Sequence, residues 1–249
     1  MSGKPTRSDK VARRRMRAVR KSHRPRGSKD RWSIQAREYP VGPDITAPTM
    51  DEILAAIDSV PKDLNWEAVS DLLIPIFPRV RPFDIDGPDP ARLIVPPGLA
   101  VELSAHISPA YLKVAPAMLE RWGRRADEVL STALANLQRR ASGLSPETIV
   151  RGSIDGVPTQ WLQSGLGCAS TFVLLPAELE RIFGVQPQLF IAPMRDLLIR
   201  LPPDVGRDLA AWLYAEIAAQ DPNCLPPFAF PFADGEVGLE PLGPAFGQA

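Results

Sequence analysis

Three polar residues stand where the surrounding sequence predicts mostly apolar structure. Arg195 and Asp196 end a short turn between the apolar runs 189–192 and 197–201, and Asn136 lies inside a predicted helix. A guanidinium in such a turn can hold a carboxylate or phosphate through its fork of N–H donors. An asparagine inside a helix makes the helix less stable, so its presence indicates that a packing contact or a functional site requires its side chain. Arg195, Asp196 and Asn136 are therefore the candidate pocket, with turn and packing roles as the competing interpretation.

A nucleophile is harder to assign. Cys168 follows Gly165-Leu166-Gly167, and a glycine-flanked thiol is reactive only where its pKa is lowered or a base lies beside it. The only histidines are His23, near the N-terminus, and His106, which we interpret as a surface or strand-end residue. One histidine in the body argues against a Ser–His–Asp triad and against a multi-histidine metal site. The glycine spacing also differs from that of nucleotide-binding loops. We therefore predict no metal and no cofactor, leave the catalytic residues unassigned, and favour a non-enzymatic protein.

The basic residues are concentrated at the N-terminus. Residues 1–32 hold 13 of the 29 Lys and Arg but only two of the 29 Asp and Glu. Their net charge is therefore +11, and that of residues 33–249 is −11. Clustered cations neutralise phosphates and give sequence-independent nucleic-acid affinity. The candidate polyanion-binding residues are Arg13, Arg14, Arg15, Arg17, Arg20 and Lys21. An acidic protein partner, a membrane surface, no specific role, and a true start at Met50 remain open alternatives.

Composition predicts a cytoplasmic protein of one folded domain. The segment 1–48 is poor in core-forming residues, so we expect a disordered tail there and a folded domain over 49–249. No apolar N-terminal signal is present, and the longest apolar runs are too short to span a bilayer. Two cysteines make no disulfide framework. Proline accounts for 28 of 249 residues, which favours short elements.

Periodicity and end signals predict the helices. Thr49 and Glu52 form a capping-box pattern that opens the domain. Pro116 and Gly123 bracket a short helix over 116–122. The clearest helix covers 127–141, where Leu130, Leu134, Leu137 and Ala141 make one apolar face and Gln138 falls off it. Further helices are expected over 66–74, from Pro176 to Gly184, and over 205–219.

Turn residues predict the strands, which should be mostly antiparallel. Asp155-Gly156 separates the runs 148–154 and 157–162, which is a strong hairpin signal. Similar hairpins are expected over 92–103 and 189–201. Single strands are expected over 171–175 and around the alternating Phe228, Phe230 and Phe232, and 75–90 is predicted to be loop. Pro158 cannot donate to a sheet, so its strand is expected at an edge. The fold class that follows is α+β, with helices packed on the sheet.

Three stretches give the chain a family resemblance. They are Asp127-Glu128-Val129-Leu130 leading to Ala135-Asn136-Leu137, Phe172-Val173-Leu174-Leu175-Pro176 leading to Leu179 and Gly184, and 189–201 with its Pro193-Met194-Arg195-Asp196 turn. Together they resemble the YtpQ-like family of bacterial proteins over roughly residues 85–220. The resemblance implies a fold and a bacterial origin, and it implies no chemistry.

The leading functional hypothesis is a binding or adaptor module. Its domain would contact a protein partner, and its basic tail would contact nucleic acid or another polyanion. The alternative is an unrecognised enzyme with a pocket around Arg195, Asp196 and Asn136.

Overall fold

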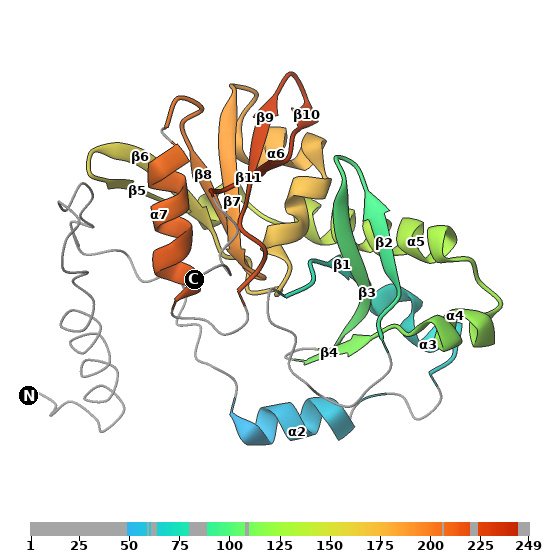
Figure 1. The fold of residues 1–249 in the computed structure, drawn as a ribbon. Coiled ribbons are helices and arrows are strands. Elements are labelled where there is room, and N and C mark those ends of the chain that lie inside the picture. The colour runs from blue at the N-terminus through green and yellow to red at the C-terminus, as the bar shows by residue number, and fades with distance from the viewer. Residues whose placement is uncertain are drawn as a thin grey trace, which may run out of the picture. The chain divides into compact units, whose positions relative to one another are not determined.

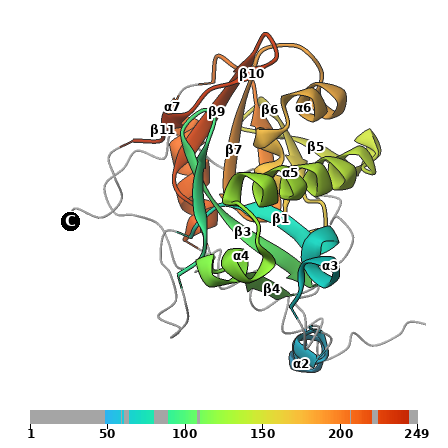
Figure 2. The same cartoon turned by 90° about the vertical axis from the view of Figure 1, so that its right-hand side faces the viewer.

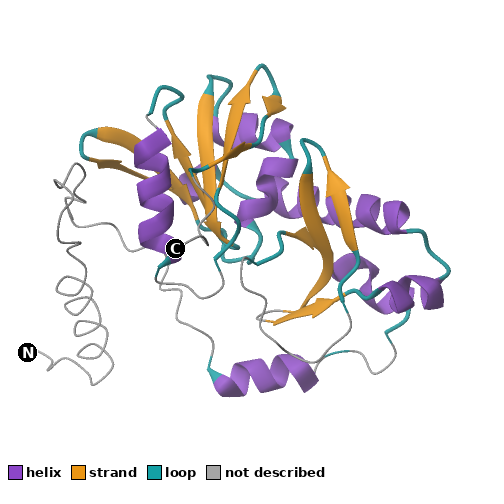
Figure 3. Ribbon diagram, in the orientation of Figure 1, coloured by secondary structure: helices purple, strands orange, loops and turns teal. Residues whose placement is uncertain are grey.

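The computed structural model of the protein describes residues 49–58, 60, 64–79, 89–107, 110–205, 207–219 and 224–243. This part of the chain forms two antiparallel β-sheets with helices packed on them, so the predicted α+β class is confirmed (Figures 1 and 3). Every strand pair in the two sheets is antiparallel. The basic residues Arg13 to Lys21 lie outside the described residues.

The smaller sheet is built around one long strand. β3 (Leu99–Ile107) pairs with β1 (Leu73–Ile76) on one side, and with β2 (Arg92–Val95) and β4 (Ala110–Lys113) on the other. The β2–β3 turn at 96–98 is the predicted one, and β3 runs four residues beyond the predicted end at Leu103. The β3–β4 register places His106 opposite Tyr111, so both side chains point to the same face of the sheet.

The larger sheet has the strand order β10-β9-β7-β8-β6-β5, with β11 also paired to β9. Two hairpins form most of it. One joins β5 (Ile149–Ile154) to β6 (Val157–Leu162), and the other joins β7 (Gln188–Met194) to β8 (Leu197–Leu201). β9 (Phe228–Ala233) adds beside β7, with the short strands β10 (Glu236–Val237) and β11 (Glu240–Pro241). Both predicted hairpins are confirmed, and the second one has Arg195 and Asp196 as its two-residue turn.

Helices cover the smaller sheet on its side away from the larger one (Figures 1 and 2). α3 (Trp66–Val69), the 3-10 helix η1 (Ser70–Leu72) and α4 (Pro116–Trp122) pack there with the first half of α5 (Ala126–Ser142). Leu73, Leu103 and Ala105 meet Val129 and Ala133 in this core. As predicted, α4 begins at Pro116 and ends before Gly123, which adopts the left-handed conformation.

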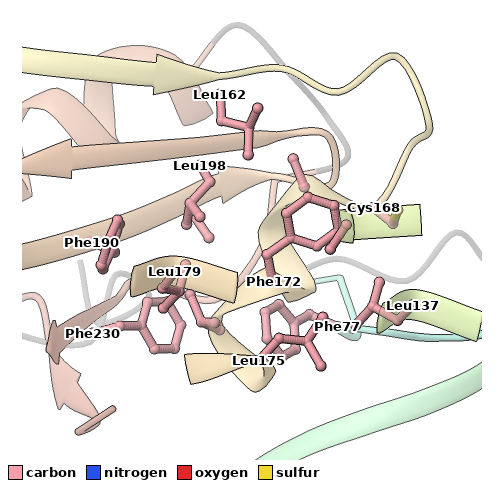
Figure 4. Close-up of a cluster of buried hydrophobic side chains, with 14 of the residues drawn as sticks. Phe77, Leu137, Leu162, Cys168, Phe172, Leu175, Leu179, Phe190, Leu198 and Phe230 are labelled. Atoms are coloured by element: carbon pink, nitrogen blue, oxygen red, sulfur yellow. The ribbon is translucent and has the colours of Figure 1, made fainter. Parts of the chain in front are cut away.

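The main core lies between the two sheets (Figure 4). It joins the second half of α5, the 3-10 helix η3 (Ala169–Leu174) and α6 (Pro176–Phe183) to one face of the larger sheet. Phe172 and Phe190 are fully buried in it, beside Leu162, Leu179 and Leu198. On the opposite face of the sheet lies α7 (Arg207–Ala218), which buries Leu209, Ala210 and Leu213. Such burial of large side chains is the main source of stability in a domain of this size.

The capping-box prediction at the start of the domain is confirmed. The Thr49 hydroxyl accepts from the Glu52 amide at 3.2 Å, and Glu52 Oε2 in turn accepts from the Thr49 amide at 2.7 Å. The reciprocal pair satisfies two donors at the start of α2 (Met50–Asp58).

Two assignments of secondary structure were wrong. The apolar run 171–175, predicted as a strand, is the buried helix η3, in which the Thr171 hydroxyl donates to the Cys168 carbonyl at 2.9 Å. The run 73–76, divided between a predicted helix and a predicted loop, is strand β1, buried on both faces. A short apolar run fits a buried strand and a buried helix equally well, because periodicity cannot separate them.

Two positional expectations also need correction. β6 is not an edge strand, since it pairs with β5 and β8; Pro158 lies opposite Ser153 of β5, in the part of β6 that extends beyond the β8 pairing. On α5 the fully buried side is Val129, Ala133, Asn136, Leu137 and Ala141, while Leu130 and Leu134 are only half-buried. Gln138 is half-buried as well and donates to Glu178 of α6.

Candidate functional site

The β7–β8 turn is hydrogen-bonded to the segment that follows strand β6 of the neighbouring hairpin. Asp196 Oδ2 accepts from the Gly165 amide at 2.7 Å, and Oδ1 accepts from the Ala169 amide at 3.3 Å and from the Ser164 hydroxyl. The Arg195 carbonyl accepts from the Ser170 amide at 3.0 Å. Asp196 thus accepts hydrogen bonds from backbone amides, as aspartate often does in turns; here the amides are those of Gly165, between β6 and η3, and of Ala169, the first residue of η3.

That loop approaches the smaller sheet at Gly167. The Tyr111 hydroxyl of β4 donates to the Gly167 carbonyl. Gly167 has a φ of +69°, and a Cβ added to it would overlap the Tyr111 hydroxyl oxygen and lie 3.7 Å from His106 Nε2. Both the backbone conformation and the close approach therefore require glycine at this position.

Three side chains stack in a row between the two sheets. The Arg195 guanidinium lies 4.9 Å from the centre of the Tyr111 ring. Tyr111 in turn stacks on His106, with ring centres 4.9 Å apart and planes 26° from parallel. A guanidinium over an aromatic face is attracted by the ring quadrupole, so the row links the β7–β8 turn to the β3–β4 hairpin.

Arg140 of α5 fixes the state of the histidine ring. Its Nη1 lies 2.7 Å from His106 Nδ1. A guanidinium only donates, so Nδ1 must accept and the ring proton must sit on Nε2. Burial and the charge of Arg140 lower the pKa of His106 to about 4, against a smaller opposing effect of Asp196. At neutral pH the ring is therefore uncharged, with an N–H donor on the side of Gly167.

Cys168 and Tyr111 are also held uncharged. Cys168 is 1% exposed, and burial raises the pKa of its thiol to about 12, with Arg140 opposing this through its charge and a hydrogen bond. Burial likewise raises the pKa of the Tyr111 hydroxyl well above its usual value, and the Arg195 and Arg140 guanidiniums act on it in the opposite direction. Desolvation disfavours the charged form of each group.

These residues form one cluster drawn from β3, β4, α5, the segment before η3 and the β7–β8 turn. We call it the polar cluster: His106, Tyr111, Arg140, Cys168, Arg195 and Asp196. All but Cys168 are half-buried, so the cluster reaches the protein surface. Its chemistry is that of two guanidiniums and one carboxylate beside three uncharged polar groups, an arrangement suited to holding an anion.

Asn136, the third residue of the predicted pocket, has a different environment. It is 3% exposed, and its Nδ2 donates to the Ser70 carbonyl at 2.7 Å and to the Leu73 carbonyl at 2.9 Å. Ser70 is the first residue of η1 and Leu73 is the first residue of β1, so Asn136 links both elements to α5 by hydrogen bonds. One helical turn later, Arg140 makes the contribution of α5 to the polar cluster.

Sequence reasoning did not assign Tyr111, Arg140 or His106 to a site. Arg140 fits the preference for cations near a helix C-terminus, and nothing in the local sequence separates it from Arg139. The one usable signal was the Gly165-Leu166-Gly167-Cys168 run, whose glycines both take positive φ values.

Other features of the described residues are weaker candidates for a functional site. Ser104, on the same face of β3 as His106, has a fully buried hydroxyl without a hydrogen-bond partner in the described part of the chain. A small apolar cavity of about 50 Å³ lies between the sheets, lined by Phe77, Leu99, Leu225, Phe228 and Phe230 among others. Typical ligand pockets occupy some 300–1,000 Å³. Within the described ranges there is no His, Cys, Asp and Glu group suited to a metal, and no helix long and apolar enough to cross a membrane.

Comparison of the chain with protein-family models, with curated proteins and with solved structures found no match.

Proposed function

We propose that this protein is a non-enzymatic binding module whose folded domain holds an anionic group of its ligand or partner at the polar cluster. The observation that carries the proposal is the charge state of the cluster. The groups able to act as nucleophile or acid–base catalyst, Cys168, Tyr111 and His106, are uncharged at neutral pH, whereas the Arg140 and Arg195 guanidiniums keep their charge.

Several features support binding over covalent catalysis. The Cys168 thiol is buried with a raised pKa, and a thiol in that state is a poor nucleophile. An imidazole with a pKa near 4 is a weak base at neutral pH. The alternative, an enzyme with a pocket around Arg195, Asp196 and Asn136, has less support, because the Asn136 amide is used in hydrogen bonds to two backbone carbonyls.

The basic N-terminal segment adds a second binding function to the proposal. Its net charge of +11 over 32 residues supports contact with nucleic acid or an acidic protein. We further propose a cytoplasmic location, where the free thiols Cys168 and Cys224 remain reduced, and a bacterial source in line with the YtpQ-like resemblance.

Histidine NMR tests the domain function directly. The chain has only two histidines, so ring ¹⁵N signals of full-length protein report on His106, with His23 as an internal reference. The protein is titrated with acetate, inorganic phosphate and sulfate, each against sodium chloride at equal ionic strength. Arg195→Gln is compared with Arg139→Gln, a control one residue before Arg140 whose side chain is 68% exposed.

We expect at least one anion to shift the His106 signals saturably in the wild type and in Arg139→Gln, and about tenfold more weakly in Arg195→Gln. If no anion gives a saturable shift up to about 100 mM, the domain does not bind anions at this site and the proposal is wrong.

A further inference from the structure

β5 is the edge strand at one end of the larger sheet, and within the described residues it pairs with β6 alone (Figure 1). Its register with β6 is unbroken over all six residues, and its middle residues, 151–153, are exposed. Proline and bulges commonly keep an edge strand from pairing with another chain, and β5 has neither. Its one charged residue is Arg151. The strand can therefore accept a further strand beside it.

The hairpin geometry decides which backbone groups of β5 point outward. The Asp155-Gly156 turn has positive φ at both positions, as a type I′ turn requires. The residues that flank such a turn form a hydrogen-bonded pair, and hydrogen-bonded pairs recur at every second position of an antiparallel ladder. By this rule positions 154, 152 and 150 bond to β6. The N–H and C=O groups of Arg151 and Ser153 point to the open edge instead, where an added strand would meet them.

The sheet face that carries the Arg151 side chain is basic near this edge. Arg151 of β5, Gln160 of β6 and Arg200 of β8 stand side by side in one row, so the two arginines share a face with Cα atoms roughly 10 Å apart. Neither arginine forms an ion pair with another described residue. Arg200 Nε donates at 3.3 Å to Gln188 Oε1, which is a neutral partner. Burial lowers the pKa of the Arg200 guanidinium, as expected of a cation without a carboxylate beside it.

We propose that the open edge of β5 binds an extended acidic segment of a partner protein, which adds to the larger sheet as a further strand. The main chain of the segment bonds to Arg151 and Ser153, and an aspartate or glutamate opposite Arg151 meets its guanidinium on the same face. A second copy of this chain is a poorer occupant, because β5 itself offers no carboxylate to Arg151. The surface shares no residue with the polar cluster, so the proposal does not depend on anion binding there.

The test follows the backbone amides of β5 by ¹⁵N–¹H NMR in the full-length protein at constant ionic strength. The probe is a blocked seven-residue peptide in which aspartate alternates with valine, and the matched control has lysine in place of aspartate. Signals from individual amides are needed because the basic N-terminal segment also attracts an acidic peptide, and binding there leaves the β5 amides unshifted. Hydrogen exchange of the same amides is measured with and without peptide.

In the free protein the amides of residues 151 and 153 should exchange rapidly, whereas those of residues 150 and 152 are already protected by β6. We expect the acidic peptide to shift the signals of Arg151 and Ser153 saturably and to slow their exchange by about tenfold or more. The lysine peptide should bind at this edge about tenfold more weakly.

Two variants separate the charge from the backbone. Arg151→Glu should weaken binding of the acidic peptide about tenfold and strengthen that of the lysine peptide, whereas Arg121→Glu, at an exposed position of α4, should change neither. Ser153→Pro removes an N–H that points away from β6, so the hairpin should still form while both peptides lose most of their affinity. The amide spectrum of the other strands shows whether each variant is folded, and if Ser153→Pro does not fold, Arg151→Glu decides alone.

Three results count against the proposal. Equal affinity of the two peptides at the β5 amides would remove the acidic preference. Unshifted β5 amides up to about 5 mM peptide would exclude strand addition at this edge. Protection of the Arg151 and Ser153 amides that increases with protein concentration, without any peptide, would assign the edge to a second copy of the chain.

Discussion

His106 Nδ1 lies 2.7 Å from Arg140 Nη1, although the two residues belong to β3 and α5 and are 34 positions apart. The contact places a permanent cation against a histidine ring, so it favours the uncharged imidazole and opposes protonation. The same arginine acts on Cys168 and Tyr111. Burial is the largest cause of the pKa shift of all three groups; Arg140 adds to its effect at His106 and opposes it at Cys168 and Tyr111.

Glycine is expected to be required at position 167. Gly165 and Gly167 have the same φ of +69°, but only the Cβ of an alanine at 167 would overlap Tyr111. Gly165→Ala should lower the free energy of unfolding by about 1 kcal/mol from backbone strain, and Gly167→Ala by about 2–4 kcal/mol. Urea unfolding of both variants measures the difference. Adding Tyr111→Phe to Gly167→Ala should recover part of the loss, whereas equal costs at the two glycines would show that the loop does not contact Tyr111.

Cys168 should be unreactive in the folded protein. Its thiol is buried with a pKa of about 12, whereas Cys224 is half-exposed. A disulfide reagent near pH 8 should modify Cys224 within minutes and Cys168 only as fast as the protein unfolds. The Cys224→Ser variant isolates the Cys168 signal. Modification of Cys168 in this variant at the rate of a free thiol would place it in an accessible, activated environment and revive a catalytic interpretation.

Stability should fall in mildly acidic solution because of His106. The folded ring takes up its proton near pH 4, whereas an unfolded histidine does so near pH 6.5. Between these values the unfolded chain binds more protons, so the free energy of unfolding decreases as the pH falls from 6.5 towards 4. With allowance for solvent screening of a half-buried ring, the loss is about 1–2 kcal/mol. Urea unfolding near pH 7 and pH 4.5 measures it, and His106→Gln should lack this component. His23→Gln, the control, should retain it; equal pH dependence in both variants would refute the assignment.

Local signals predicted the fold well and the site poorly. Asp155-Gly156 and the Pro116–Gly123 pair fix their own elements through backbone preferences, and both assignments are confirmed. Arg195 and Asp196 were recognisable because they interrupt apolar sequence. The cluster residues His106, Tyr111 and Arg140 come from β3, β4 and α5, and they lie near the β7–β8 turn only after the two sheets pack together. Gln138 shows the same limit, since helical periodicity places it off the apolar face but α6 brings Glu178 to it.

The basic N-terminal segment should bind nucleic acid electrostatically. If about six phosphates are contacted, the logarithm of duplex DNA affinity should fall with the logarithm of salt concentration at a slope near −5. Replacing Arg13, Arg14, Arg15 and Arg17 together with Ala should bring the slope towards about −2 and weaken all sequences alike, because phosphate contacts carry no base information. Fluorescence anisotropy of labelled DNA with the full-length protein measures both. Lack of binding even at low salt would rule out nucleic acid as the partner of this segment.

The charge state of His106 is tested most directly by titrating this histidine in the protein without added ligand. Burial and Arg140 hold His106 as an uncharged ring with the proton on Nε2, beside two guanidiniums. Ring ¹⁵N and ¹H correlation spectra between about pH 3.5 and 9 report both the tautomer and the midpoint, with His23 expected near 6.5 as an internal reference. We predict an unprotonated Nδ1 and a midpoint near pH 4 for His106. A midpoint near 6.5, or a proton on Nδ1 at neutral pH, would contradict this prediction.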